Sequence, residues 1–353
     1  MKKLLLLSLF IFPLFSNAQV LITENFNSLN VGNISNEITG AVAGQGSYYL
    51  FSSNGTPPTT TSNAGVSNAQ IVSTGNASQG ILLEGPNGDL GSRFVWKDGL
   101  PALWSSRTSM NQIIELEVDI NPGAGTSTSR NTFGAYIFNA AGDKVLAGFT
   151  VRAATRELFL VAYSTPTGNP VGNYSYSLAA APGIQLPANT FSRVGISYNV
   201  TTRLVTIKGP GLATGATVTG SATATDPAEV DFIAFSGNTT AAPNSASATM
   251  VMDNLTIKAT GTDSLLDNTT FDNVITSFSV SPNPANDFIT ISNSENVLVN
   301  AISITDLNGR VVKQNSFTDV TNVQVNISDL SSGVYMMNIT TDKGSVTKKI
   351  IKN

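Results

Sequence analysis

Apolar and polar residues alternate with a period of two through most of the chain. Clear examples are the segments 144–151 (KVLAGFTV), 157–163 (ELFLVAY), 203–209 (RLVTIKG) and 230–237 (VDFIAFSG). Clusters of Gly, Pro, Asn, Asp or Ser bound each segment, and such alternation between turn residues is typical of strands in a sandwich or barrel. No apolar stripe at helical spacing stands out. The pattern therefore predicts an all-β protein.

Polar segments between the predicted strands indicate loops. NAAGD (139–143) and NVTTR (199–203) each separate two alternating runs, so both are predicted hairpin loops. The low-complexity segments 52–65 and 237–249 are expected to be long exposed loops.

The first 18 residues have the organisation of a secretory signal peptide. Lys2 and Lys3 precede an apolar run over 4–15, and Ser16 and Ala18 give a small-x-small cleavage pattern. The run is shorter than the roughly 20 residues that a membrane-spanning helix needs. We predict a signal peptide over 1–18 and no membrane span in the mature chain.

Charge and residue usage exclude several kinds of function. Removing Lys2 and Lys3 from the 19 basic side chains leaves 17 against 23 acidic ones, a net charge of −6. Nucleic acids and anionic membranes need basic surfaces, so neither is an expected partner. The chain has no Cys and no His, which excludes disulfides, His-dependent nucleophilic catalysis and an ordinary zinc site.

The last fifth of the chain is a separate strand-rich unit. The segment 263–274 follows the last long strand and is the predicted linker to a domain over 275–353. Pro282 and Pro284 cannot donate ladder hydrogen bonds, so they belong at a strand entrance or a sheet edge. Asn308-Gly309 favours a tight hairpin turn. These features predict a small β-sandwich.

The motifs SPNPANDFITI, ITDLNGRVV, ISDLSSGVYMMNI and TKKIIKN follow one another in this unit. In order and spacing they resemble the type A C-terminal sorting domain of the type IX secretion system. The resemblance implies export through the type IX machinery to the cell surface or the medium. The residues expected to carry the sorting signal are Pro282, Asn283, Pro284, Gly309, Gly333, Tyr335, Lys348 and Lys349.

The central region, residues 19–262, resembles a concanavalin- or laminin-G-like jelly-roll β-sandwich. The resemblance rests on Glu24 and Phe26 near its start and on Asp253, Asn254 and Ile257 near its end. Jelly rolls of this type often hold one Ca²⁺ near the first and last strands. The resemblance thus implies Glu24 and Asp253 as candidate calcium ligands, although no Asp-rich calcium loop is present.

Glycan binding or adhesion is the first hypothesis for the central domain. Sugar sites combine flat aromatic faces with hydrogen-bonding groups, because a pyranose has an apolar face and a rim of hydroxyls. The candidate residues are Trp96, Trp104, Tyr48 and Tyr49. The alternative for each Trp is packing in the core.

A glycoside hydrolase is the second hypothesis. The strand QIIELEVDI places Glu115, Glu117 and Asp119 on one face, opposite an apolar face. Jelly-roll hydrolases of the laminarinase type carry Glu-x-Asp-x-Glu, whereas the order here is Glu-x-Glu-x-Asp. The shorter acid at the donor position disturbs the carboxyl spacing that a retaining mechanism needs. An ordinary polar strand face is the alternative.

A purely structural surface or matrix protein is the third hypothesis, because low charge and abundant Ser, Thr and Asn fit it equally well.

The tripeptide DSL also resembles a short O-glycosylation signal, which makes Ser264 a candidate modification site. We expect a non-enzymatic protein that binds extracellular polysaccharide or mediates adhesion.

Overall fold

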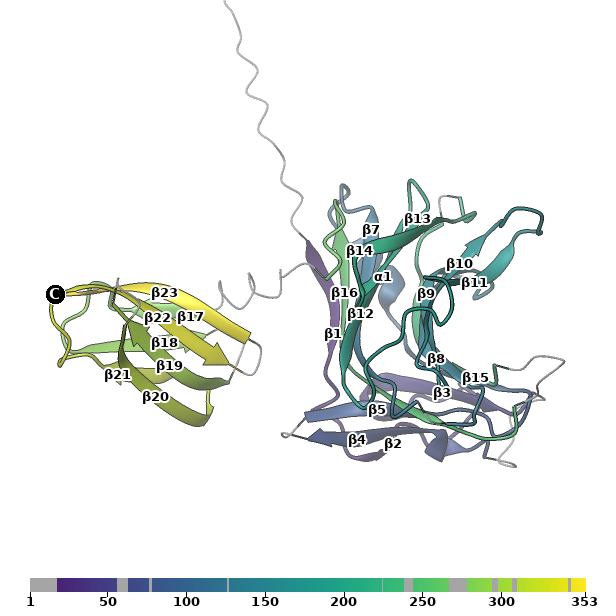
Figure 1. Ribbon diagram of the computed structural model, residues 1–353, viewed down its shortest axis with the longest axis horizontal. Helices are drawn as coiled ribbons and strands as arrows, with labels where there is room; N and C mark the ends of the chain where they lie inside the picture. Colours follow the sequence, from purple (N-terminus) through teal and green to yellow (C-terminus); the bar gives the residue numbers. More distant parts are fainter. Residues whose placement is uncertain are drawn as a thin grey trace, which may run out of the picture. The chain divides into compact units, whose positions relative to one another are not determined.

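The computed structural model describes residues 18–55, 63–75, 78–125, 127–223, 225–237, 244–266, 278–293, 298–306, 310–341 and 344–353. The chain divides into two units, Met1–Leu266 and Asp267–Asn353 (Figure 1). The predicted signal peptide, apart from Ala18, lies outside the described residues. The same holds for much of the predicted loops 52–65 and 237–249.

The first unit contains a nine-stranded antiparallel sheet. Eight strands follow the order β14-β13-β12-β7-β16-β5-β4-β2, and β1 pairs with β16. Strand β16 is long enough to pair with β7 along one side and with β5 and β1 along the other. The bounds are β1 Gln19–Glu24, β2 Gly32–Asn33, β4 Ala69–Gly75, β5 Ser78–Glu84, β7 Ile113–Asn121, β12 Ser192–Asn199, β13 Leu204–Gly209, β14 Leu212–Thr219 and β16 Thr249–Thr260.

A seven-stranded antiparallel sheet forms the second layer, in the order β11-β10-β9-β8-β15-β6-β3. The bounds are β3 Tyr48–Ser53, β6 Ser92–Lys97, β8 Thr132–Phe138, β9 Val145–Arg152, β10 Leu158–Ser164, β11 Gly172–Ser177 and β15 Glu229–Phe235. The predicted loops 139–143 and 199–203 do connect hairpin partners, β8 with β9 and β12 with β13.

Short helical segments interrupt the strands, although the sequence pattern predicts none. The α-helix α1 spans Leu100–Ser105, and 3-10 turns span Gln45–Ser47 (η1) and Val66–Asn68 (η2). Helix α1 begins after Gly99, whose φ of +113° suits a glycine, and Pro101 occupies its first turn. It is too short for its apolar spacing to be visible in the sequence.

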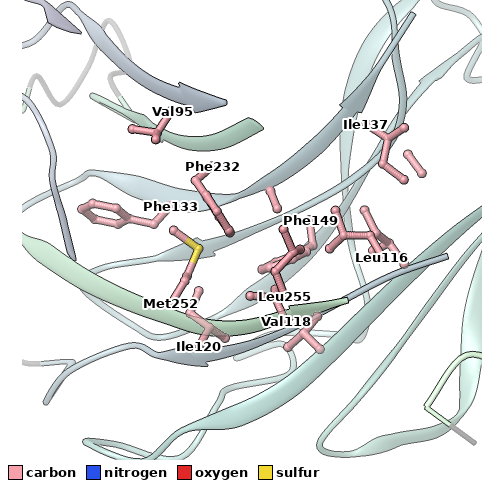
Figure 2. Close-up of a cluster of buried hydrophobic side chains, with 14 of the residues drawn as sticks. Val95, Leu116, Val118, Ile120, Phe133, Ile137, Phe149, Phe232, Met252 and Leu255 are labelled. Carbon is pink, nitrogen blue, oxygen red and sulfur yellow. The ribbon is translucent and has the colours of Figure 1, made fainter. Parts of the chain in front are cut away.

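The core lies between the inner faces of the two sheets. Leu116, Val118 and Ile120 of β7 point toward Phe133 and Phe149 of the seven-stranded sheet (Figure 2). This packing is what the alternation along each strand predicts, since every second residue faces inward. The first unit is therefore a jelly-roll β-sandwich, as expected.

The predicted linker begins too early at residue 263. Leu265 is fully buried, and the Lys208 ammonium lies 3.6 Å from the Asp263 carboxylate. Residues 263–266 thus belong to the first unit. Residues 267–277 lie outside the described part of the chain.

The second unit is a small sandwich with its own core. A three-stranded sheet (β17-β18-β21) and a four-stranded sheet (β20-β19-β22-β23) both contribute to one apolar cluster that includes Ile289, Val325, Ile302 and Met337. The bounds are β17 Phe278–Ser281, β18 Phe288–Asn293, β19 Val299–Thr305, β20 Val311–Val320, β21 Val323–Asn326, β22 Gly333–Thr341 and β23 Gly344–Lys352. The fold class predicted for this unit is confirmed.

Candidate functional site

The outer face of the seven-stranded sheet, turned away from the core, is rich in aromatic side chains. We call it the aromatic face. A second apolar cluster, separate from the main core, lies on it and contains Tyr136, Phe138, Val145, Val161 and Ile233, with Phe94 and Phe235 packed against them. Several of these rings contact one another, with centroid separations from 5.4 to 6.5 Å. Sequence reasoning missed this surface because its members come from five strands.

One row of residues crosses this face from strand to strand. Tyr49 of β3 pairs with Trp96 of β6, Trp96 with Asp231 of β15, and Asp231 with Tyr136 of β8. Directly paired residues of antiparallel strands point to the same side of a sheet, so the four side chains share the face. The row therefore places a carboxyl group between an indole and a phenol.

Tyr49 and Trp96 form the aromatic end of the row. Their rings stack with centroids 5.4 Å apart and an interplanar angle of 15°. Gly40 lies against the tip of the indole, since a Cβ built there would fall 2.5 Å from Cη2 of Trp96. Both rings are half-buried. The structure thus keeps these two predicted residues together on one face.

Asp231 is the buried acid of the row, with 3% of its surface exposed. It shares a hydrogen bond with Glu229, and we call the two residues the acid pair. Burial, followed by the charge of Glu229 and that hydrogen bond, raises the pKa of Asp231 to about 9. Burial also raises the pKa of Glu229. At neutral pH Asp231 is therefore protonated and donates this hydrogen bond to Glu229.

One buried polar atom of this row has no hydrogen-bond partner in the described part of the chain. Oδ1 of Asp231 is buried and accepts no hydrogen bond there. Such an atom is costly in a folded protein unless water or a ligand satisfies it. A depression of about 490 Å³ is lined by Glu229 of the acid pair together with Asp98, Gly99, Pro101, Asn139 and residues 140–142 and 228. Glu229 thus links this space to the buried Asp231, whose Oδ1 is unsatisfied.

The prediction that Trp104 and Tyr48 contribute to a binding surface is wrong. Trp104 is 1% exposed, its Nε1 donates to Asp226 at 2.9 Å, and the Arg107 guanidinium covers its ring. Tyr48 is also buried, and its hydroxyl donates to Glu24 at 3.4 Å. Both side chains pack in the core.

The predicted hydrolase residues Glu115, Glu117 and Asp119 do share the outer face of β7, and we call them the carboxylate strip. The Lys258 ammonium lies 2.7 Å from Glu117 and 3.5 Å from Glu115. The Arg193 guanidinium lies 3.4 Å from Glu117 and 3.3 Å from Asp119. Each acid is thus paired with a cation, which is the arrangement of a structural ion network. These ion pairs give no support to the catalytic role predicted for the three acids.

Glu115 also contacts the C-terminal residues of the first unit. It is fully buried, and it accepts hydrogen bonds from Ser264 N and Oγ at 2.6 and 2.7 Å. Burial raises the pKa of Glu115, while the bonds from Ser264 and the charge of Lys258 oppose that rise. The Ser264 hydroxyl, predicted as a glycan acceptor, donates to Glu115, and this contact gives that prediction no support.

Glu24 and Asp253 are held by other partners. Glu24 accepts from Phe26 N at 2.8 Å, and Asp253 accepts from Asn254 N at 2.6 Å and from Ser78 Oγ at 3.1 Å. Within the described ranges, no three acidic side chains gather as a metal site. These two residues give no support to the predicted calcium site.

In the second unit, the predicted sorting residues meet at the terminal strand. The Asn283 side chain donates to Lys349 O and accepts from Ile351 N, both at 2.8 Å, so it pairs with β23 as a neighbouring strand would. Ala285 continues this pairing through Ile351 O and Asn353 N. Pro282 and Pro284, which flank Asn283, follow cis peptide bonds. We call this arrangement the asparagine clasp.

The remaining sorting residues lie around β22 and β23. Tyr335 donates through its hydroxyl to Ser331 O at 2.8 Å and lies over the turn at Gly333. Lys349 is exposed and Lys348 is half-buried on β23. Gly309 lies outside the described residues.

The second unit thus has the sandwich fold and the terminal motifs of a secretion signal. Residues 279–353 match the family described as "Secretion system C-terminal sorting domain". The C-terminal unit is a type IX sorting domain, and the protein is exported to the cell surface or the extracellular space. In the part of the chain that the structure describes, no helix is long and apolar enough to cross a membrane.

Solved structures similar to the chain include two alginate lyases and a toxin domain. Alginate lyase Aly36B is 15% identical with a TM-score of 0.40, covering 69% of this chain and 97% of its own. Alginate lyase vAL-1 from Chlorella virus is 11% identical with a TM-score of 0.39, covering 54% and 88%. The binding domain of botulinum neurotoxin DC in complex with SialylT is 13% identical with a TM-score of 0.36, covering 91% and 73%. At such TM-scores none of them assigns a site to this chain, and no curated protein matches it.

Proposed function

We propose that the first unit is a polysaccharide-binding module that the sorting domain carries out of the cell. The observation that carries the proposal is the row Tyr49–Trp96–Asp231–Tyr136 on the aromatic face. Aromatic rings offer flat apolar surfaces to sugar rings, and buried polar atoms among them fix hydroxyl groups. The module binds its ligand without turning it over.

Affinity electrophoresis of the chain from Gln19 onward tests this proposal. Polysaccharide in the gel is expected to retard the wild-type protein, and Trp96→Ala is expected to weaken the retardation about tenfold or more, because aromatic anchors dominate such surfaces. Tyr174→Ala is the matched control. Tyr174 belongs to the same sheet, but it pairs with the core-facing Ala162 and therefore points to the opposite side.

Three outcomes of this experiment count against the proposal. The first is an absence of retardation in every gel. The second is an equal loss of retardation in Trp96→Ala and Tyr174→Ala when the two variants are equally stable to heat. The third is release of reducing or unsaturated sugars by the wild-type protein, which would favour an enzymatic function over a binding one.

For the sorting domain, we propose that the asparagine clasp presents the terminal strand to the export machinery. Support comes from the two hydrogen bonds that join Asn283 to Lys349 and Ile351. Asn283→Ala is expected to reduce secretion by the native host several-fold. Asn326→Ala, whose side chain caps the turn at Ser328, is the control and should be secreted normally. Normal secretion of Asn283→Ala would contradict this role.

A further inference from the structure

The acid pair lies in surroundings that contain acids but few available cations. Glu229 lines the depression together with Asp98. The cations nearest in sequence are engaged elsewhere, since the Lys97 ammonium lies over the Tyr48 ring and the Lys144 ammonium over the Tyr163 ring, each at 5.5 Å. Arg152 of the same sheet pairs with Glu157 at 3.0 Å. Within the described residues neither Glu229 nor Asp98 forms an ion pair, so a ligand in the depression meets two acidic groups without a directly paired cation.

The hydrogen-bonding groups of the row are suited to hydroxyl groups. Because Asp231 holds the proton that it donates to Glu229, its Oδ1 has the character of a carbonyl oxygen and accepts only. Trp96 and Tyr136 are the cross-strand neighbours of Asp231, and each carries one donor group, an indole N–H and a phenolic hydroxyl. A hydroxyl group both donates and accepts, so it can bond to each of these atoms.

We infer that the acid pair and its two neighbours select a neutral polysaccharide, whose hydroxyls bond to Asp231, and reject polyuronates. This inference rests on the proposed function and names the ligand class of that same face. A carboxylate-bearing sugar would approach the charges of Glu229 and Asp98 without a counter-charge, and like charges in a partly desolvated site are costly. A neutral hexose polymer avoids this cost and supplies the donor that Oδ1 lacks.

Affinity electrophoresis with two sets of polysaccharide tests the inference. The neutral set is laminarin, galactomannan and pullulan, and the acidic set is alginate and polygalacturonate. The chain from Gln19 onward is expected to be retarded by at least one neutral polymer and by neither acidic one. Retardation by a polyuronate that Trp96→Ala abolishes would overturn the inference and leave the proposed function intact. An absence of retardation in all five gels would overturn both.

Two substitutions at one position make the test sharper. Asp231→Asn keeps both a donor for Glu229 and an acceptor at Oδ1, so it imitates the protonated acid and should bind within about threefold of wild type. Asp231→Leu has a similar size but no acceptor, and it should bind about tenfold more weakly, the equivalent of one hydrogen bond. Leucine suits this apolar cluster, and a thermal melt checks that the variant folds. Equal binding by the leucine and asparagine variants would overturn the role of Asp231.

Discussion

Both sheets of the first unit carry carboxyl groups on their outer faces, but the partners of these groups differ. On the nine-stranded sheet, Lys258 and Arg193 neutralise the carboxylate strip. On the seven-stranded sheet, Asp231 lies among aromatic rings and is paired only with another acid. The first arrangement satisfies its own charges, whereas the second leaves an acceptor unsatisfied. The comparison teaches that the partner of a buried acid, and not its position on a strand, indicates whether it is available to a ligand.

The largest effect is expected from breaking the ion network of the strip. Lys258→Met leaves Glu115 and Glu117 buried with less positive charge, which should lower the free energy of unfolding by about 3–5 kcal/mol. Urea denaturation measures this. Arg152→Met is the control, because Arg152 itself is exposed and its pair with Glu157 should contribute less than about 1 kcal/mol. Equal losses in the two variants would show that the strip is not structural.

The second prediction concerns the pH dependence of stability at the acid pair. The pKa of Asp231 is raised to about 9 from its ordinary 3.8, so its contribution to stability is complete below about pH 4 and is lost as the pH rises toward 9. Glu229, whose pKa is also raised, acts in the same direction. Asp231→Asn removes the part of this dependence that Asp231 carries.

Between pH 5 and 7 the wild type should therefore lose about 2–3 kcal/mol of unfolding free energy relative to Asp231→Asn, at about 1.4 kcal/mol per pH unit. Asp98 and Tyr136 stay unchanged in both proteins. Denaturant titrations at four pH values measure the difference. Parallel curves for the two proteins would contradict the shared proton.

A smaller effect is expected at the boundary of the unit. Ser264→Ala removes the hydroxyl bond to Glu115 but keeps the backbone bond, so it should cost about 1 kcal/mol. The matched control is Ser177→Ala, whose hydroxyl contacts Glu157 at the exposed edge strand β11 and should contribute almost nothing. If Ser264→Ala is as stable as wild type, the hydroxyl bond to Glu115 does not contribute to the docking of residues 263–266.

The strands and the inward faces could be predicted from the sequence, because alternation is a local property of the chain. The alternation of β7 placed Glu115 and Glu117 opposite Leu116 and Val118, and the structure confirms that division. The partners of the strip could not be predicted, since Lys258 lies 141 residues from Glu117. The cation that decides the role of each acid comes from another strand.

The candidate site was predicted only in part for the same reason. Trp96 and Trp104 are close in sequence and look equivalent, yet the first lies on a strand and the second on a six-residue helix that closes the core. The segment EVDFIAF carries Glu229 and Asp231 in alternation, a signal that was visible in the sequence. Its meaning depended on the register that places Asp231 beside Trp96 and Tyr136.

The central claim is that polysaccharide binds to the aromatic face, and tryptophan fluorescence tests it most directly. The chain has two Trp residues, so Trp104→Phe leaves Trp96 as the only reporter and Trp96→Phe leaves the core residue. A neutral polysaccharide that retards the protein should shift the emission of Trp96 and leave that of Trp104 unchanged. An unchanged emission of Trp96 at a ligand concentration that retards the same variant would place binding elsewhere and contradict the account.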